Sequence, residues 1–167
     1  MSSEDPSGVG ALVADLKRAL AGVPPQRVVV LCVGNEMRGD DGFARAVARE
    51  LGSACASRVF DGGQAPENEL PCVARLSPEA VVLVDAVDFG APPGTLRILD
   101  PDALREDGFD THTASLSLAA KFLFKSSVRV VIVLAAQPLK VELGDVMSPE
   151  VSGAATTAAK ALSSLLT

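Results

Sequence analysis

Two carboxylates and one imidazole in this chain could bind a metal ion or move protons. Asp41 lies in a glycine-containing turn, Asp85 closes an apolar run, and His112 is the one histidine of the chain. Oxygen and nitrogen ligands of this kind suit borderline divalent metals such as nickel or zinc better than Ca²⁺ or Mg²⁺. The residue types therefore indicate metal or acid–base chemistry, although their spacing does not identify the metal.

The strand and turn that carry Asp41 form the clearest local pattern. Residues 27–33, RVVVLCV, contain a continuous apolar run and predict a strand buried on both faces of a parallel sheet. The turn GNEMRGDDG follows at once, and Gly34, Asn35 and Gly39 allow its tight backbone. Because open α/β sheets place ligands at the carboxyl ends of their strands, this turn is expected to carry the chemistry.

Strands and helices are predicted to alternate along the rest of the chain. Further strands are expected at 58–60, 80–84, 95–99 and 128–135, and helices at 9–21, 41–51, 66–76, from 111 or 113 onward, and after the N-cap Ser148. Residues 100–110 are predicted to form a polar loop. This order predicts a three-layer α/β/α sandwich with a mostly parallel five-stranded sheet, in which 95–99 is the antiparallel edge strand.

Length and composition predict one compact domain over 1–167, with a helical extension at 1–26 and the core at 27–167. A net charge of −6 argues against a nucleic-acid partner. No apolar run is long enough to span a membrane, and the N-terminus lacks a signal-peptide pattern, so a cytoplasmic protein without membrane association is expected. The three cysteines show no CxxC spacing and are expected to be reduced and mostly buried.

If the sheet is parallel, several polar side chains converge at its carboxyl edge. They are Asp40, Asp41, Asp61, Asp85, Asp88, His112 and Gln137. This convergence is the main indication of function.

Three of these residues also have local structural interpretations. An aspartate before a helix is most often an N-cap, which fits Asp40, and a carboxylate in a first helical turn, such as Asp41, is favoured by the helix dipole. A lone histidine at a helix entrance, such as His112, is more often a capping or surface residue than a ligand. Asp85 favours function, because a carboxylate closing an apolar strand is partly desolvated and needs a partner.

Several short motifs lie between about Arg27 and the C-terminus, in an order and at spacings that match those of a known family. They are Gly34-Asn35, Gly39-Asp40-Asp41-Gly42, Asp61-Gly62-Gly63, Ala65-Pro66-Glu67-Asn68, Asp85-Ala86-Val87-Asp88, Thr111-His112 and Gln137-Pro138. This ordered set resembles the hydrogenase maturation endopeptidases, which process the large subunits of nickel-iron hydrogenases. The similarity looks closest to the branch that serves formate-hydrogenlyase-type and related hydrogenases.

The resemblance implies an endopeptidase that removes a C-terminal extension from the hydrogenase large-subunit precursor after nickel insertion. Family positions that contact the metal match Asp41, Asp85 and His112, and the nickel is held by precursor cysteines. The metal then belongs to the substrate, and no tightly bound cofactor is expected. The precursor is the expected partner, with maturation chaperones as further partners. Gly34 and Asn35 are expected to shape the turn, and Gln137 to line the cleft.

Two positions depart from the family pattern. Ala44 stands where a second glycine often follows Gly42, and Thr113-Ala114-Ser115 stand where a proline or methionine often follows the histidine. These departures concern the substrate subtype rather than the fold.

The expected mechanism is hydrolysis by water. No Ser/His/Asp or Cys/His arrangement is evident, and Cys32 lies mid-strand, so a covalent acyl-enzyme is disfavoured. Asp41, Asp85 and His112 are predicted to hold the substrate nickel and to position the peptide beside a polarised water, with Asp41 as base.

Two alternatives remain open from the sequence. A non-catalytic nickel-sensing chaperone could recognise the metal with the same ligands. A flavodoxin-like or Rossmann-like nucleotide-binding module fits the fold, although six Phe, no Trp and no Tyr, together with an acidic turn, count against it.

Overall fold

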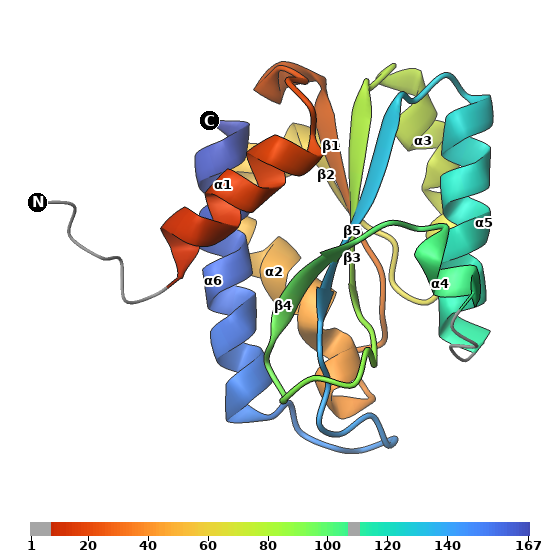
Figure 1. Cartoon of the computed structure of the whole chain (residues 1–167). Coiled ribbons are helices and arrows are strands. Elements are labelled where there is room, and N and C mark those ends of the chain that lie inside the picture. The colour runs from red at the N-terminus through yellow and green to blue at the C-terminus, as the bar shows by residue number, and fades with distance from the viewer. Residues whose placement is uncertain (1–7, 107–110) are drawn as a thin grey trace, which may run out of the picture.

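The computed structural model describes residues 8–106 and 111–167, without the side chains of 54, 105, 106 and 111–113. Helices cover both faces of a single sheet (Figure 1). The strands are β1 (Val28–Cys32), β2 (Val59–Asp61), β3 (Ala80–Ala86), β4 (Leu96–Leu99) and β5 (Val130–Ala136), in the order β2-β1-β3-β5-β4. All neighbours pair in parallel except β4 and β5, which are antiparallel. The predicted sandwich with an antiparallel edge strand is confirmed.

The central strands are buried on both faces because their apolar residues are continuous. Alternate side chains of β1 enter different clusters: Val28 and Val30 join one core cluster, and Val29 and Leu31 join the other. The first cluster lies under α1 (Val9–Ala19), α2 (Phe43–Leu51) and α6 (Pro149–Leu166), and the second under α3 (Leu70–Arg75) and α5 (Thr111–Lys125) (Figure 1). The sheet is thus packed between two helical layers.

The helix after β1 starts later than predicted. Residues Gly39–Gly42 form a 3₁₀ turn, and α2 begins at Phe43 with Gly42 as N-cap and no side-chain cap. The local interpretation of Asp40 as an N-cap is therefore wrong.

Other boundaries also move. The predicted polar loop contains the short helix α4 (Ala103–Glu106), which buries Leu104. β5 starts at Val130, because the backbone after α5 turns through Ser127, at φ 71°, and Val128 donates its N–H to Leu123. At the other end of the chain, Ser148 caps α6 as predicted, accepting a 3.4 Å bond from the Val151 N–H.

The N-terminal helix is part of the core. Leu12, Leu16 and Leu20 are buried in the same cluster as the inner face of α6. Cys32 and Cys55 are buried, Cys72 is exposed, and all three are free thiols. Across the described ranges, no helix is both long and apolar enough to cross a membrane.

Candidate active site

A pocket of about 250 Å³ opens at the carboxyl ends of β1 and β3. Its walls are formed by Val33, Gly34, Asn35, Arg38, Asp41, Gly63, Gln64, Asp85 and Ser115. The turn after β1 brings Asp41, the end of β3 brings Asp85, and both carboxylates face the same space. Two of the three groups singled out in the sequence are thus together in one pocket.

The turn holds Asp41 in one orientation. The Asn35 N–H donates to the Asp41 carbonyl at 3.1 Å and to its Oδ2 at 3.0 Å. A methyl group on Gly34, whose φ is +147°, would lie 2.1 Å from the Asp41 carbonyl oxygen. Only glycine fits this close approach, so Gly34 and the Asn35 N–H shape the turn around Asp41.

Asp85 lies inside β3, since that strand continues to Ala86, and its side chain is 2% exposed. Next to it, burial raises the pKa of the Cys32 thiol well above its usual range, and the charges of Asp61 and Asp85 raise it further. A thiol in this state is a poor nucleophile. The expectation that Cys32 forms no acyl-enzyme agrees with this environment.

The third group comes from α5, which begins at Thr111. The side chain of His112 lies outside the described residues, so its part in the site stays a prediction. Ser115, one helical turn further along α5, lines the pocket, and residues three apart share a helix face. Among the described side chains, no group of three or more His, Cys, Asp or Glu could hold a metal ion.

Asp40 has a different position from its neighbour. It is fully buried and accepts hydrogen bonds from the N–H groups of Leu139 (2.7 Å), Lys140 (3.0 Å) and Ser148 (2.6 Å), and from the Ser148 hydroxyl (2.9 Å). Burial alone would raise the pKa of this carboxyl, but the four hydrogen bonds outweigh it and lower the pKa below its usual range. Asp40 thus ties the turn beneath Asp41 to the loop before α6.

This lowered pKa predicts a specific loss of stability in acid. The folded pKa lies below the unfolded value of about 3.9, so the ionised Asp40 contributes its full stabilisation above that pH and loses it as pH falls through the folded pKa. We expect the difference in unfolding free energy between wild type and Asp40→Asn to shrink as the pH falls from about 4 through the lower folded pKa of Asp40. Urea denaturation at several pH values measures it, and a constant difference would contradict this assignment.

Gln137 does not line the pocket. Its Oε1 accepts bonds from the N–H groups of Phe89 (2.8 Å) and Ala91 (3.2 Å), and its Nε2 donates to Asp88 at 2.9 Å. The bond from Gln137 lowers the pKa of Asp88, assisted by the Gly90 N–H. Gln137 and Asp88 therefore hold the connection between β3 and β4.

Asp61 and Gly39 support the walls of the pocket. Asp61 accepts a 3.2 Å bond from the N–H of Gly63, a pocket residue, and pairs with Arg45 at 3.4 Å. Gly39, at φ +57°, brings the turn against the following loop, where a methyl group would lie 2.7 Å from the Lys140 carbonyl oxygen.

Sequence reasoning missed three polar residues of the pocket wall: Arg38, Gln64 and Ser115. The position of each residue in the sequence could have indicated that it lines the pocket. Arg38 lies within the turn before Asp41, Gln64 directly follows the motif Asp61-Gly62-Gly63, and Ser115 is one turn from His112.

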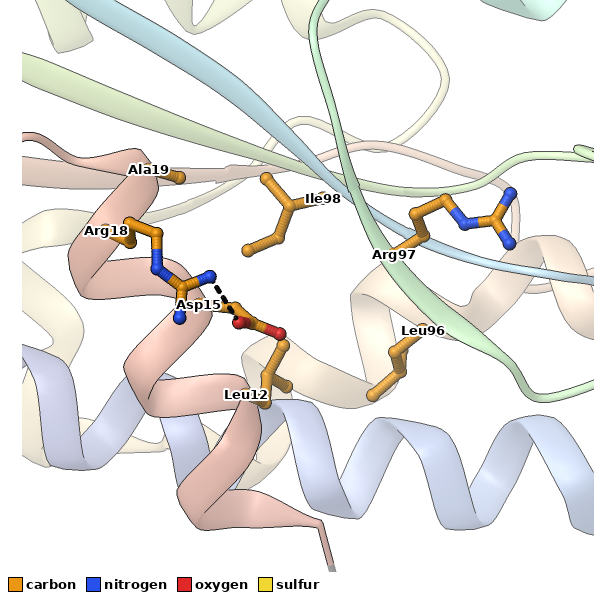
Figure 2. Close-up of a pocket in the computed structure, with 7 residues that line it drawn as sticks. All are labelled: Leu12, Asp15, Arg18, Ala19, Leu96, Arg97 and Ile98. Carbon is orange, nitrogen blue, oxygen red and sulfur yellow. Dashed lines mark hydrogen bonds and ion pairs between the residues drawn. The ribbon is translucent and has the colours of Figure 1, made fainter.

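A larger pocket of about 490 Å³ lies between α1 and β4 (Figure 2). Leu12, Leu96 and Ile98 give it an apolar lining. Its acidic group, Asp15, pairs with Arg18 at 3.0 Å in an exposed i,i+3 arrangement, and Arg97 stacks over a phenylalanine ring outside it. This pocket offers no convergent catalytic groups, so the smaller one is the candidate active site.

The family model described as "Hydrogenase maturation protease" (HycI) matches residues 43–165. The chain belongs to this family. The resemblance seen in the sequence is confirmed, and so is the prediction of a peptidase. The matched family is not a nucleotide-binding one. Asp85 and His112 lie inside the matched range, and Asp41 lies just before it.

Individual hydrogenase maturation proteases are similar over most of the chain. Hydrogenase 3 maturation protease of Escherichia coli K12 is 41% identical over 113 residues, which are 66% of this chain and 72% of that protein. The crystal structure of the maturation protease HycI from Thermococcus kodakarensis has a TM-score of 0.78 at 28% identity, covering 91% of this chain and 98% of that one. The solution structure of the endopeptidase HycI from Escherichia coli has a TM-score of 0.71 at 34% identity, covering 82% and 89%.

Proposed function

We propose that this hydrogenase maturation protease is a cytoplasmic endopeptidase that removes the C-terminal extension of a nickel-loaded hydrogenase large-subunit precursor. The observation that carries the proposal is the pairing of Asp41 and Asp85 in one pocket at the carboxyl edge of the sheet. The names of the related proteins support a hydrogenase precursor as substrate. Maturation chaperones are further proposed partners.

Nickel is proposed to act as part of the substrate. Asp41 and Asp85 supply two oxygen ligands, and His112, one helical turn before the pocket residue Ser115, supplies an imidazole nitrogen. Nickel held by the precursor would bring a positive charge next to the carboxylates of Asp41 and Asp85, which both line the pocket. Nickel in the precursor then favours productive binding, and the protease needs no metal of its own.

Asp41 is proposed as the base. Its carboxylate removes a proton from a water molecule, the water oxygen bonds to the scissile carbonyl carbon, the carbon–nitrogen bond breaks, and the proton passes to the leaving amine. The Asn35 N–H fixes the direction of this carboxylate. Together with Asp85 and His112, Asp41 also holds the nickel that positions the peptide.

Mass spectrometry of nickel-loaded and nickel-free precursor after incubation with the purified chain tests the proposal. We expect only the loaded precursor to become shorter, by one C-terminal peptide. Equal cleavage of both forms would remove nickel from the mechanism. A precursor that binds but keeps its full length would instead favour the nickel-sensing chaperone.

A further inference from the structure

Five large apolar side chains are exposed beside the candidate active site. They belong to the turn before Asp41 and to the loop between β5 and α6: Met37, Leu139, Val141, Leu143 and Val146. We call these five the apolar platform. Val146 is 82% exposed, Leu143 70% and Met37 65%. Clusters of exposed apolar residues commonly mark surfaces that bind another molecule.

The platform is held in place by hydrogen bonds. Gly144 donates its N–H to the Met37 carbonyl at 2.9 Å, and the Asp145 carboxylate accepts from the Glu142 N–H at 3.0 Å. The buried Asp40 accepts from Leu139 and Lys140. A loop fixed in this way presents its apolar side chains at low entropic cost to a partner.

The platform is also continuous with the active-site pocket. Arg38 lines the pocket, and its Nε donates to the Val141 carbonyl at 3.1 Å. Met37 precedes Arg38 in the same turn, and the turn and the loop lie together at the carboxyl edge of the sheet, the lower edge in Figure 1. A protein whose peptide enters the pocket on this side must pass over the platform.

The pocket alone is too small to select one protein substrate. Its volume of about 250 Å³ is below the roughly 300–1,000 Å³ that encloses a drug-sized ligand. Stable protein complexes bury about 800 Å² on each partner. Most of the contact with a protein substrate therefore has to be made outside the pocket, and the apolar platform is the adjoining surface suited to it.

We infer that the apolar platform docks an apolar surface segment of the hydrogenase large-subunit precursor next to its scissile peptide. This inference rests on the proposed function for the identity of the partner. Methionine is enriched at protein interfaces, and Met37 can adapt to the shape of the partner.

The test is the double variant Leu143→Gln/Val146→Gln, measured against the nickel-loaded large-subunit precursor. We expect the affinity of the precursor to fall at least tenfold and KM to rise by a similar factor, with kcat within twofold of wild type. The matched control is Leu76→Gln, at the end of α3 beside the start of β3, where Leu76 is 47% exposed. The control is expected to leave both affinity and KM unchanged.

A loss of affinity below threefold in the double variant would overturn the inference. The inference would also be overturned if the double substitution only converted a self-associated form of the chain to monomer. Sedimentation would reveal this change. Hydrogen exchange of the wild-type protein gives an independent reading, because amides 141–146 should exchange more slowly with the precursor bound. If the wild type binds the precursor without cutting it, the proposed function fails, whereas the platform is still judged by affinity alone.

Discussion

Replacing Asp41 with asparagine is expected to lower kcat/KM for the nickel-loaded precursor by about 10²–10⁴-fold, the usual contribution of a positioned acid–base group. Asparagine has nearly the same shape, and its side-chain oxygen can still accept the Asn35 N–H that now bonds to Asp41 at 3.0 Å. The turn should therefore persist, while proton transfer and the negative charge that Asp41 offers to the nickel are lost. Single-turnover cleavage followed by mass spectrometry measures the effect.

The matched control is Asp15→Asn, the same change in α1, where Asp15 forms a surface ion pair with Arg18. It is expected to cleave like wild type, and both variants should unfold at the wild-type temperature. Asp85→Asn and His112→Ala are expected to impair cleavage as well. Retained cleavage of nickel-loaded substrate in all three site variants would remove the proposed mechanism.

Replacing Asp40 with asparagine is expected to cost about 3 kcal/mol of unfolding free energy at neutral pH. Both carboxylate oxygens accept bonds, Oδ1 from the Ser148 N–H and Oδ2 from the Leu139 and Lys140 N–H groups and the Ser148 hydroxyl. An amide would turn its NH₂ group toward one of these buried donors. That donor would lose its partner inside the protein.

Urea denaturation measures this loss as a lower midpoint with an unchanged slope. Asp88→Asn is the comparison, because Asp88 is exposed and its bond to Gln137 can persist with an amide. It should lie within about 0.5 kcal/mol of wild type. An Asp40→Asn variant as stable as Asp88→Asn would mean that the buried bonds contribute little.

The sheet could be predicted from the sequence because its strands are continuous apolar runs. Val28–Cys32 and Ala80–Val84 are buried at every position, as expected for strands covered on both faces of a parallel sheet. They can therefore be recognised as strands without knowing their exact ends. The proximity of Asp41 and Asp85 could be predicted from the topology, because the carboxyl ends of parallel strands lie at one edge of the sheet. The strand starting at Leu96 could be predicted because a glycine-containing turn between Gly90 and Gly94 precedes it.

The supports of the site could not be predicted in the same way. Asp40 and Ser148 are 108 residues apart, and no local pattern pairs them. Ser148 was expected to cap α6 and does, but its hydroxyl also donates to Asp40. The apolar platform lies in an irregular loop, so its leucines and valines have no period that marks them as exposed.

The bond between Asp40 and Ser148 affects when the enzyme can first become active. Ribosomes release the chain from the N-terminus, so the turn with Asp41 emerges long before Ser148 does. Until that late segment leaves the exit tunnel, Asp40 lacks the partners that fix the base next to it. We expect nascent chains that end before Ser148 to remain inert toward other proteins.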